Sequence, residues 1–157
     1  MVGKILIVDG VATNRIVLKV RLASACYETI QAETAAQGLT LARSLRPDAI
    51  LLDVGLATPS CAEMCRKLRR DPRTRRLPVI VIGAAGGDQR LAALRAGADD
   101  AMPRPVDDMI LLARLRSLLR ASDRAGDFEE DVPGFGLSEA ADPFEAAAHI
   151  AVVTLGT

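Results

Sequence analysis

Three short runs of apolar side chains, rich in isoleucine, valine and leucine, are the clearest pattern in the chain. They lie within residues 4–8, 48–53 and 78–82. An apolar residue at nearly every position is typical of a strand covered on both faces, because a strand with one face in solvent alternates apolar and polar residues. The three runs therefore predict the buried central strands of a parallel sheet.

Segments with apolar residues at helical spacing separate these strands. The expected helices cover residues 14–25, 35–46, 60–70, 87–96 and 106–120, and two weaker strands cover residues 27–31 and 99–102. The first helix is expected to begin after an N-cap at Thr13, and Pro47 and Gly97 are the expected stops of the second and fourth helices. The expected buried face of the first helix consists of Ile16, Val17, Val20 and either Leu22 or Ala23.

Strands that alternate with helices predict an α/β domain with helices on both faces of the sheet. In such domains the functional groups gather at the carboxyl ends of the strands. Asp9 and Asp53 each end a predicted buried strand, so we expect both acids at this edge. The alternative is that either acid serves as a helix N-cap or turn residue.

In this order and at this spacing, the residues from about 3 to 120 resemble a response-regulator receiver domain. The segments that carry the resemblance are residues 5–9, 14–15, 47–54, 77–81, 96–99 and 105–108. Residues 65–68, 71–75 and 114–118 are similar to the first receiver of PleD-type regulators, in which two receivers precede a diguanylate cyclase domain. The resemblance implies a flavodoxin-like, doubly wound sheet of five parallel strands in the order 2-1-3-4-5, with helices on both faces.

The resemblance also implies phosphorelay chemistry at the predicted edge. Asp53 would accept the phosphoryl group, Mg²⁺ would be held by Asp9, Asp53 and the carbonyl oxygen of Gly55, and Arg104 would take the place of the usual lysine. Attack of a carboxylate on a phosphoryl group brings like charges together, so these cations neutralise them. The implied partners are a sensor histidine kinase or phosphotransfer protein, a downstream output such as diguanylate cyclase, and a second copy in a homodimer. The domain itself would be regulatory and not an enzyme.

Several positions depart from the family pattern. Gly10 replaces a second acid after the first strand, which weakens the expected Mg²⁺ binding, and Gly83 replaces the hydroxyl residue that contacts the phosphoryl group. Ala101 stands at the aromatic switch position, and Arg104 replaces lysine before Pro105, across a peptide bond expected to be cis. Two interpretations therefore stay open: a phosphoacceptor receiver that regulates an output, and a pseudo-receiver that acts as a dimerisation or docking module without phosphotransfer.

Charge divides the chain into a basic and an acidic part. The formal net charge is zero, yet residues 1–120 carry 19 Lys and Arg against 12 Asp and Glu, and residues 121–157 carry 1 against 8. Residues 66–76 hold seven of the cations. We interpret this run as a solvated face, or as a docking surface for an acidic partner. We do not expect nucleic-acid binding, because the chain has four aromatic residues and no recognition helix of a known type.

The last part of the sequence changes in composition. Residues 121–147 are acidic, alanine-rich and interrupted by proline and glycine, which predicts a linker. Residues 148–157 return to an apolar pattern that matches the first strand, which predicts the start of a truncated second receiver. The alternative is a strand that adds to a sheet edge. The leucines of the last predicted helix are expected to pack on the sheet, with a homodimer through this helix as the alternative; they are Leu111, Leu112, Leu115, Leu118 and Leu119.

The cysteines and the hydropathy of the chain indicate the cellular compartment in which the protein is expected. No apolar run approaches the length that a bilayer requires, and three cysteines in a chain of this size indicate reduced thiols, so we expect a cytoplasmic protein without a membrane partner. Cys61 and Cys65 lie one helical turn apart, far from Cys26 and from the single histidine, His149. This spacing is not that of a zinc site, and we expect buried apolar cysteines.

Overall fold

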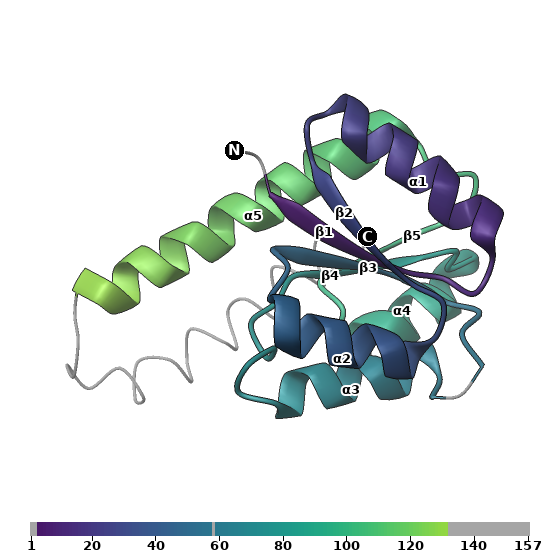
Figure 1. Cartoon of the computed structure of the whole chain (residues 1–157). Coiled ribbons are helices and arrows are strands. Elements are labelled where there is room, and N and C mark those ends of the chain that lie inside the picture. Colours follow the sequence, from purple (N-terminus) through teal and green to yellow (C-terminus); the bar gives the residue numbers. More distant parts are fainter. Residues whose placement is uncertain (1–2, 58, 132–157) are drawn as a thin grey trace.

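The computed structural model describes residues 3–57 and 59–131, which form five strands and five helices in strict alternation (Figure 1). The strands are β1 (Lys4–Val8), β2 (Glu28–Ala32), β3 (Ala49–Asp53), β4 (Val79–Ile82) and β5 (Asp100–Met102). The helices are α1 (Ala12–Ser24), α2 (Ala35–Leu45), α3 (Cys61–Arg70), α4 (Gly86–Ala96) and α5 (Asp108–Asp131). Every predicted element of residues 4–120 is present.

The strands form one parallel sheet in the order β2-β1-β3-β4-β5, which confirms the predicted fold. The register places Val8 of β1 beside Leu52 of β3. Asp9 and Asp53, the next residue on each strand, therefore reach the same carboxyl edge side by side. The doubly wound topology thus brings together two acids that are far apart in the sequence.

The helices cover both faces of the sheet, so β1, β3, β4 and β5 are largely buried, whereas the edge strand β2 is partly exposed. Helices α2, α3 and α4 lie on one face, where they pack against Leu6, Val8, Ile50, Leu52, Val79 and Val81. Helices α1 and α5 lie on the other face, where they pack against Ile5, Ile7, Ala49, Leu51, Ile80 and Ile82. Successive strand residues point to opposite faces, so a continuous apolar run supplies two separate cores.

Helix α1 differs from its sequence prediction in both its start and its buried face. It begins at Ala12 after Val11, which offers no side-chain cap, and Thr13 lies inside its first turn. The residues turned to the core are Arg15, Leu18 and Leu22, whereas Ile16, Val17 and Val20 are exposed by 56%, 40% and 63%. Of the predicted face, Leu22 alone is buried.

Two arginines account for the orientation of α1. Arg15 donates from Nη1 to the carbonyl oxygen of Asp9 at 2.7 Å, and Arg21 contacts Asp108 at 3.0 Å and the carbonyl oxygen of Val106 at 3.0 Å. Since apolar residues occur on most sides of this helix, periodicity does not select one face. The arginine contacts to the strand edge and to the start of α5 fix the rotation.

Helix α5 is longer than predicted. It continues to Asp131, past the expected end at Arg120 and into the segment assigned to a linker. Leu111 and Leu115 are buried, and Leu112, Leu118 and Leu119 pack partly against the same core, as expected. The remainder of the linker and residues 148–157 lie outside the described residues. Within the described ranges, no helix combines the length and the apolar character needed to cross a bilayer.

Candidate functional site

Asp9, Asp53 and Arg104 meet at the carboxyl edge of the sheet, as the sequence predicted. The Nη2 atom of Arg104 lies 2.8 Å from Oδ2 of Asp9 and 2.9 Å from Oδ1 of Asp53. The side chains of Asp9 and Asp53 are 2% and 16% exposed, and that of Arg104 is 33% exposed. One guanidinium nitrogen therefore bridges two largely buried carboxylates at a site that opens to solvent.

The orientation of Asp9 is fixed by its neighbours in the chain. Its Oδ1 atom accepts a hydrogen bond from the backbone N–H of Val11 at 2.8 Å, while its carbonyl oxygen accepts one from Arg15. The bond to a backbone N–H two residues ahead closes an Asx turn. The turn-residue alternative therefore holds for Asp9 through Oδ1, while Oδ2 contacts Arg104, and its role as a metal ligand stays a prediction.

Gly83 lies beneath the side chain of Arg104. Its φ angle is +95°, and a Cβ atom there would lie 3.1 Å from Cγ1 of Val54, 3.3 Å from Nε of Arg104 and 3.5 Å from Oδ1 of Asp53. A larger side chain would crowd the guanidinium and would also be strained at this φ angle. The missing side chain at the end of β4 therefore leaves the space through which Arg104 reaches the acids.

Gly55 lies beside the other oxygen of Asp53. A Cβ atom at Gly55 would lie 3.1 Å from Oδ2 of Asp53, so its lack of a side chain keeps this oxygen accessible. The role of its carbonyl oxygen as a metal ligand stays a prediction.

The donor set at this edge has the chemistry of a magnesium site. Among the described residues no group of three or more histidine, cysteine, aspartate or glutamate side chains gathers around one point. Two carboxylate oxygens, from Asp9 and Asp53, do converge, because both contact the same nitrogen of Arg104. Mg²⁺ commonly binds proteins through one or two carboxylates and completes its shell with water and substrate phosphate oxygens. Gly10, exposed after Asp9, adds no third acid.

Two further positions of the family pattern lie in β5 and just after it. Ala101 is 2% exposed in β5, paired with Val81, and carries no group that can change position between states. The Arg104–Pro105 peptide bond is cis, as predicted.

The cysteines of α3 are buried close behind the loop that follows Asp53. Cys61 and Cys65 are 5% and 0% exposed and belong to the core beneath α2, α3 and α4. The hydrogen bond to Cys65 and burial raise the pKa of the Cys61 thiol, and the same bond lowers the pKa of Cys65. They pack as small apolar side chains, in line with the prediction.

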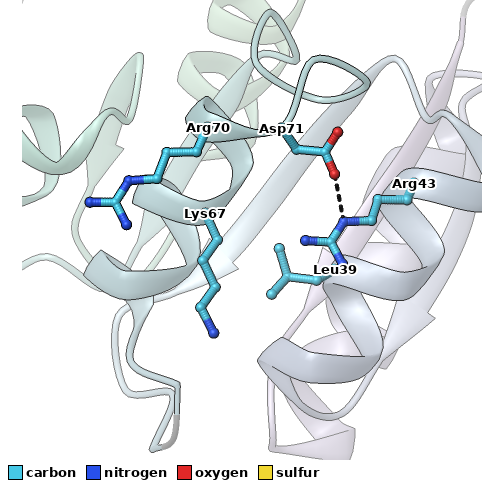
Figure 2. Close-up of a pocket in the computed structure, with 5 residues that line it drawn as sticks. All are labelled: Leu39, Arg43, Lys67, Arg70 and Asp71. Carbon is cyan, nitrogen blue, oxygen red and sulfur yellow. Dashed lines mark ion pairs between the residues drawn. The ribbon is translucent and has the colours of Figure 1, made fainter.

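The basic segment forms a separate surface between α2 and α3. Figure 2 shows a hollow of about 420 Å³ that is lined by Leu39, Arg43, Lys67, Arg70 and Asp71. Nε of Arg43 lies 2.8 Å from Oδ2 of Asp71. A hydrogen bond from Arg73 lowers the pKa of Asp71 to about 2. The hollow shares no lining residue with the acid pair, so its cations take no part in that site.

Arg15 contacts the backbone of Asp9, although the sequence did not predict it as a residue of the site. It is 9% exposed, holds the carbonyl oxygen of Asp9, and lies 3.5 Å from Glu33. The available signal was a cation on a helix that directly follows a strand ending in an acid.

The comparisons with known proteins agree with this geometry. Residues 5–116 match the family described as the response regulator receiver domain. The chain belongs to the receiver domain family. Receiver domains are the regulatory domains of two-component systems, in which they act between a histidine kinase or phosphotransfer protein and an output domain.

Two curated relatives match equally well by identity. The chain is 40% identical to the response regulator PleD of Caulobacter vibrioides over 121 residues, which is 76% of this chain and 27% of PleD. It is also 40% identical to the phosphate regulon transcriptional regulatory protein PhoB of Pseudomonas aeruginosa over 139 residues, which is 87% of this chain and 60% of PhoB. The chain thus spans about a quarter of one relative and somewhat more than half of the other.

Solved structures show the same fold. A response regulator from Chloroflexus aurantiacus superposes with a TM-score of 0.73 at 29% identity, covering 76% of this chain and 99% of that one. The receiver domain of the sensor histidine kinase PA1611 from Pseudomonas aeruginosa has a TM-score of 0.69 at 28% identity, with 76% and 98% covered. That structure carries a magnesium ion coordinated in its active site cleft.

Proposed function

We propose that Asp53 of this receiver accepts a phosphoryl group from a sensor histidine kinase or phosphotransfer protein and thereby regulates a downstream output. The observation that carries the proposal is the shared contact of Arg104 with Asp9 and Asp53, at 2.8 and 2.9 Å. It puts the predicted nucleophile, a second acid and a cation at one point of the carboxyl edge of the sheet.

The proposed nucleophile is Oδ2 of Asp53. Its partner oxygen, Oδ1, accepts from Arg104, whereas Oδ2 faces Gly55, which has no side chain to cover it. A bond forms between Oδ2 and phosphorus while the bond from phosphorus to the donor breaks, and the donor leaves as neutral imidazole or as the carboxylate of a small acyl phosphate. The product is an aspartyl phosphate.

Charge neutralisation is the main requirement of this step. The guanidinium of Arg104 presents several donors in a planar fork and can hold two phosphoryl oxygens at once. A Mg²⁺ ion bound by Asp9 and Asp53, with the carbonyl oxygen of Gly55 as the predicted third ligand, would neutralise the developing charge on the phosphoryl oxygens. Asp9 is oriented for this role by the Val11 amide.

The output proposed from the resemblance to PleD-type regulators is a diguanylate cyclase domain. With Gly83 in place of a hydroxyl residue and Ala101 in place of an aromatic residue, no side-chain movement at these positions reports the phosphoryl group. We therefore expect regulation through a change of association, for which a homodimer is one route.

The second candidate function is a pseudo-receiver that works as a dimerisation or docking module. One observation favours it: Arg104 of this chain bridges the two acids directly, so the site contains its own cation. An internal ion pair that held the site in one arrangement would suit a constitutive binding surface.

Beryllofluoride, which imitates a phosphoryl group on aspartate, separates the two functions. We expect ¹⁹F NMR of the chain with Mg²⁺ to give a bound fluoride resonance, which is lost in Asp53→Asn. The matched control is Asp88→Asn in the first turn of α4, which changes the charge equally outside the site and retains the signal. A folded parent protein without bound fluoride at saturating Mg²⁺ would favour the pseudo-receiver.

A further inference from the structure

We propose that a basic groove at the amino edge of the sheet is the docking site of the acidic segment that follows α5 in the same chain. This amino-edge groove has a volume of about 610 Å³ and is lined by the end of α2, by the loops that precede β3 and β4, and by residues of α5. It shares no lining residue with the acid pair at the carboxyl edge, so the inference is independent of the proposed function.

Arginines dominate the charge of the amino-edge groove. Four of them line it, against the two carboxylates of Asp48 and Asp123; they are Arg46, Arg73, Arg75 and Arg76. Oδ2 of Asp48 already accepts a hydrogen bond from the Lys4 amide at 2.7 Å. Arg73 pairs with Asp71, whereas no ion pair or hydrogen bond between described residues involves the side chains of Arg46 and Arg75, which are both exposed. The groove therefore has an excess of positive charge and two cations available to an anionic partner.

Apolar side chains line the same groove beside the arginines. They come from the loops before β3 and β4 and from α5, and they are Pro47, Pro72, Leu77, Pro78 and Leu119. An occupant that carries both carboxylates and apolar side chains matches both kinds of lining residue, since it pairs the cations and removes apolar surface from water. A phosphate backbone would leave the apolar part uncovered, so an acidic peptide with aromatic residues fits the groove better.

The chain itself contains a peptide of this composition directly after α5. Residues 132–157 hold three acidic residues, no lysine or arginine, and two of the three phenylalanines of the whole chain. The acids and the phenylalanines lie close together in the sequence, as Phe135, Glu139, Asp142, Phe144 and Glu145. Residues 135–145 are therefore the segment that we assign to the groove.

The covalent connection favours docking within one chain. Helix α5 lines the groove at Asp123 and continues to Asp131, past the amino ends of the strands (Figure 1). This extension measures about 12 Å, and an extended chain covers the same distance in about four residues. A segment that begins at residue 135 is thus long enough to return to the groove, where the tether gives it a high effective concentration.

The test measures tryptophan fluorescence in the full chain, whose sequence has no tryptophan of its own. Phe144→Trp places one reporter in the acidic segment, and quenching by acrylamide reports how far this side chain is exposed. We expect quenching to be at least about twofold weaker in low salt than in about 0.5 M NaCl, because salt screens the attraction between the segment and the groove. This protection should not depend on protein concentration, since the contact lies within one chain.

Charge reversal in the Phe144→Trp chain shows whether the amino-edge groove is the docking site. Arg46→Glu combined with Arg75→Glu should abolish the protection at low salt. The matched control combines Lys19→Glu with Arg95→Glu, which reverses two exposed cations outside the groove, and it should retain the protection. Circular dichroism establishes that each variant is folded.

A second pair of substitutions restores the charge complementarity with the signs exchanged. Glu139→Lys with Asp142→Lys, added to the chain with the reversed groove, should bring back the protection. Equal quenching in low and high salt, equal effects of the groove and control reversals, or no rescue by the exchanged charges overturns the inference. Protection that increases with protein concentration also overturns it, because the segment would then dock on a second copy of the chain.

Discussion

Gly38 offers a sharp test of how closely α2 packs on the sheet. It lies inside the helix and faces β1. A Cβ atom at this position would lie 2.8 Å from Cγ2 and 3.1 Å from Cγ1 of Val8, and 2.9 Å from Cε of Met64. The Gly38→Ala substitution therefore adds one methyl group to a space that is already full.

Helix propensity and core overpacking change the stability of Gly38→Ala in opposite directions. Alanine favours a helix interior over glycine by about 1 kcal/mol, whereas overpacking a core typically costs about 1–3 kcal/mol. The terminal methyl of Met64 can rotate away, but Val8 is β-branched and 0% exposed in a strand paired on both sides. We therefore expect the clash with Val8 to prevail and the free energy of unfolding to fall by about 1 kcal/mol.

Urea unfolding of four variants measures this balance: Gly38→Ala, Gly87→Ala, Val8→Ala and the double variant of Val8 and Gly38. Gly87→Ala in α4 is the matched control, because a Cβ atom there meets nothing within 4 Å, and it should be as stable as the parent or more so. In a Val8→Ala background the clash is relieved, so Gly38→Ala should no longer lower the free energy of unfolding. Equal stability of Gly38→Ala and Gly87→Ala in the native background would refute the reasoning.

Two further predictions concern the basic side of the domain. Arg69 donates to the carbonyl oxygens of Gly97, Arg75 and Leu77 and to Asp99, so Arg69→Ala should lower the free energy of unfolding by about 2–4 kcal/mol in urea; a loss under 1 kcal/mol would show these bonds to be replaceable by water. The pKa of Asp71, lowered to about 2 by the hydrogen bond from Arg73, should appear as an NMR titration midpoint near 2. Since this pKa lies below the usual 3.8, the stabilisation is present above that pH and disappears as the pH falls towards 2, a dependence that Asp71→Asn should remove.

The sheet and its two acids were predictable because the strands are buried on both faces. A continuous apolar run marks such a strand almost regardless of context, and an acid at its end is placed by topology alone. The positions of Asp9 and Asp53 could therefore be predicted without knowledge of side-chain packing. The same holds for Arg104, whose place before Pro105 matches a family motif.

The orientation of α1 was not predictable in the same way. Its sequence has apolar residues at positions 16, 17, 18, 20 and 22, so several faces satisfy helical periodicity. The contacts of Arg15 and Arg21 with backbone carbonyl oxygens outside the helix decide between them, and such contacts leave no periodic signal.

The prediction that α5 ends at Arg120 was wrong for a different reason. Beyond Arg120 the composition turns acidic and includes Gly126, which predicted a linker, yet the helix continues to Asp131. Up to that residue the segment contains no proline, and one glycine inside a helix costs about 1 kcal/mol, which does not break it. Proline first recurs at Pro133, which lies outside the described residues.

The central claim, that Asp53 is a phosphoryl acceptor, is tested most directly by intact mass spectrometry. The chain is incubated with Mg²⁺ and acetyl phosphate beside Asp53→Ala, with quenching in the cold because aspartyl phosphates hydrolyse. We expect the mass of one added phosphoryl group on the parent, removed by hydroxylamine, and none on Asp53→Ala. An adduct of equal yield on Asp53→Ala, or no adduct on a folded parent that also fails to bind beryllofluoride, would contradict it.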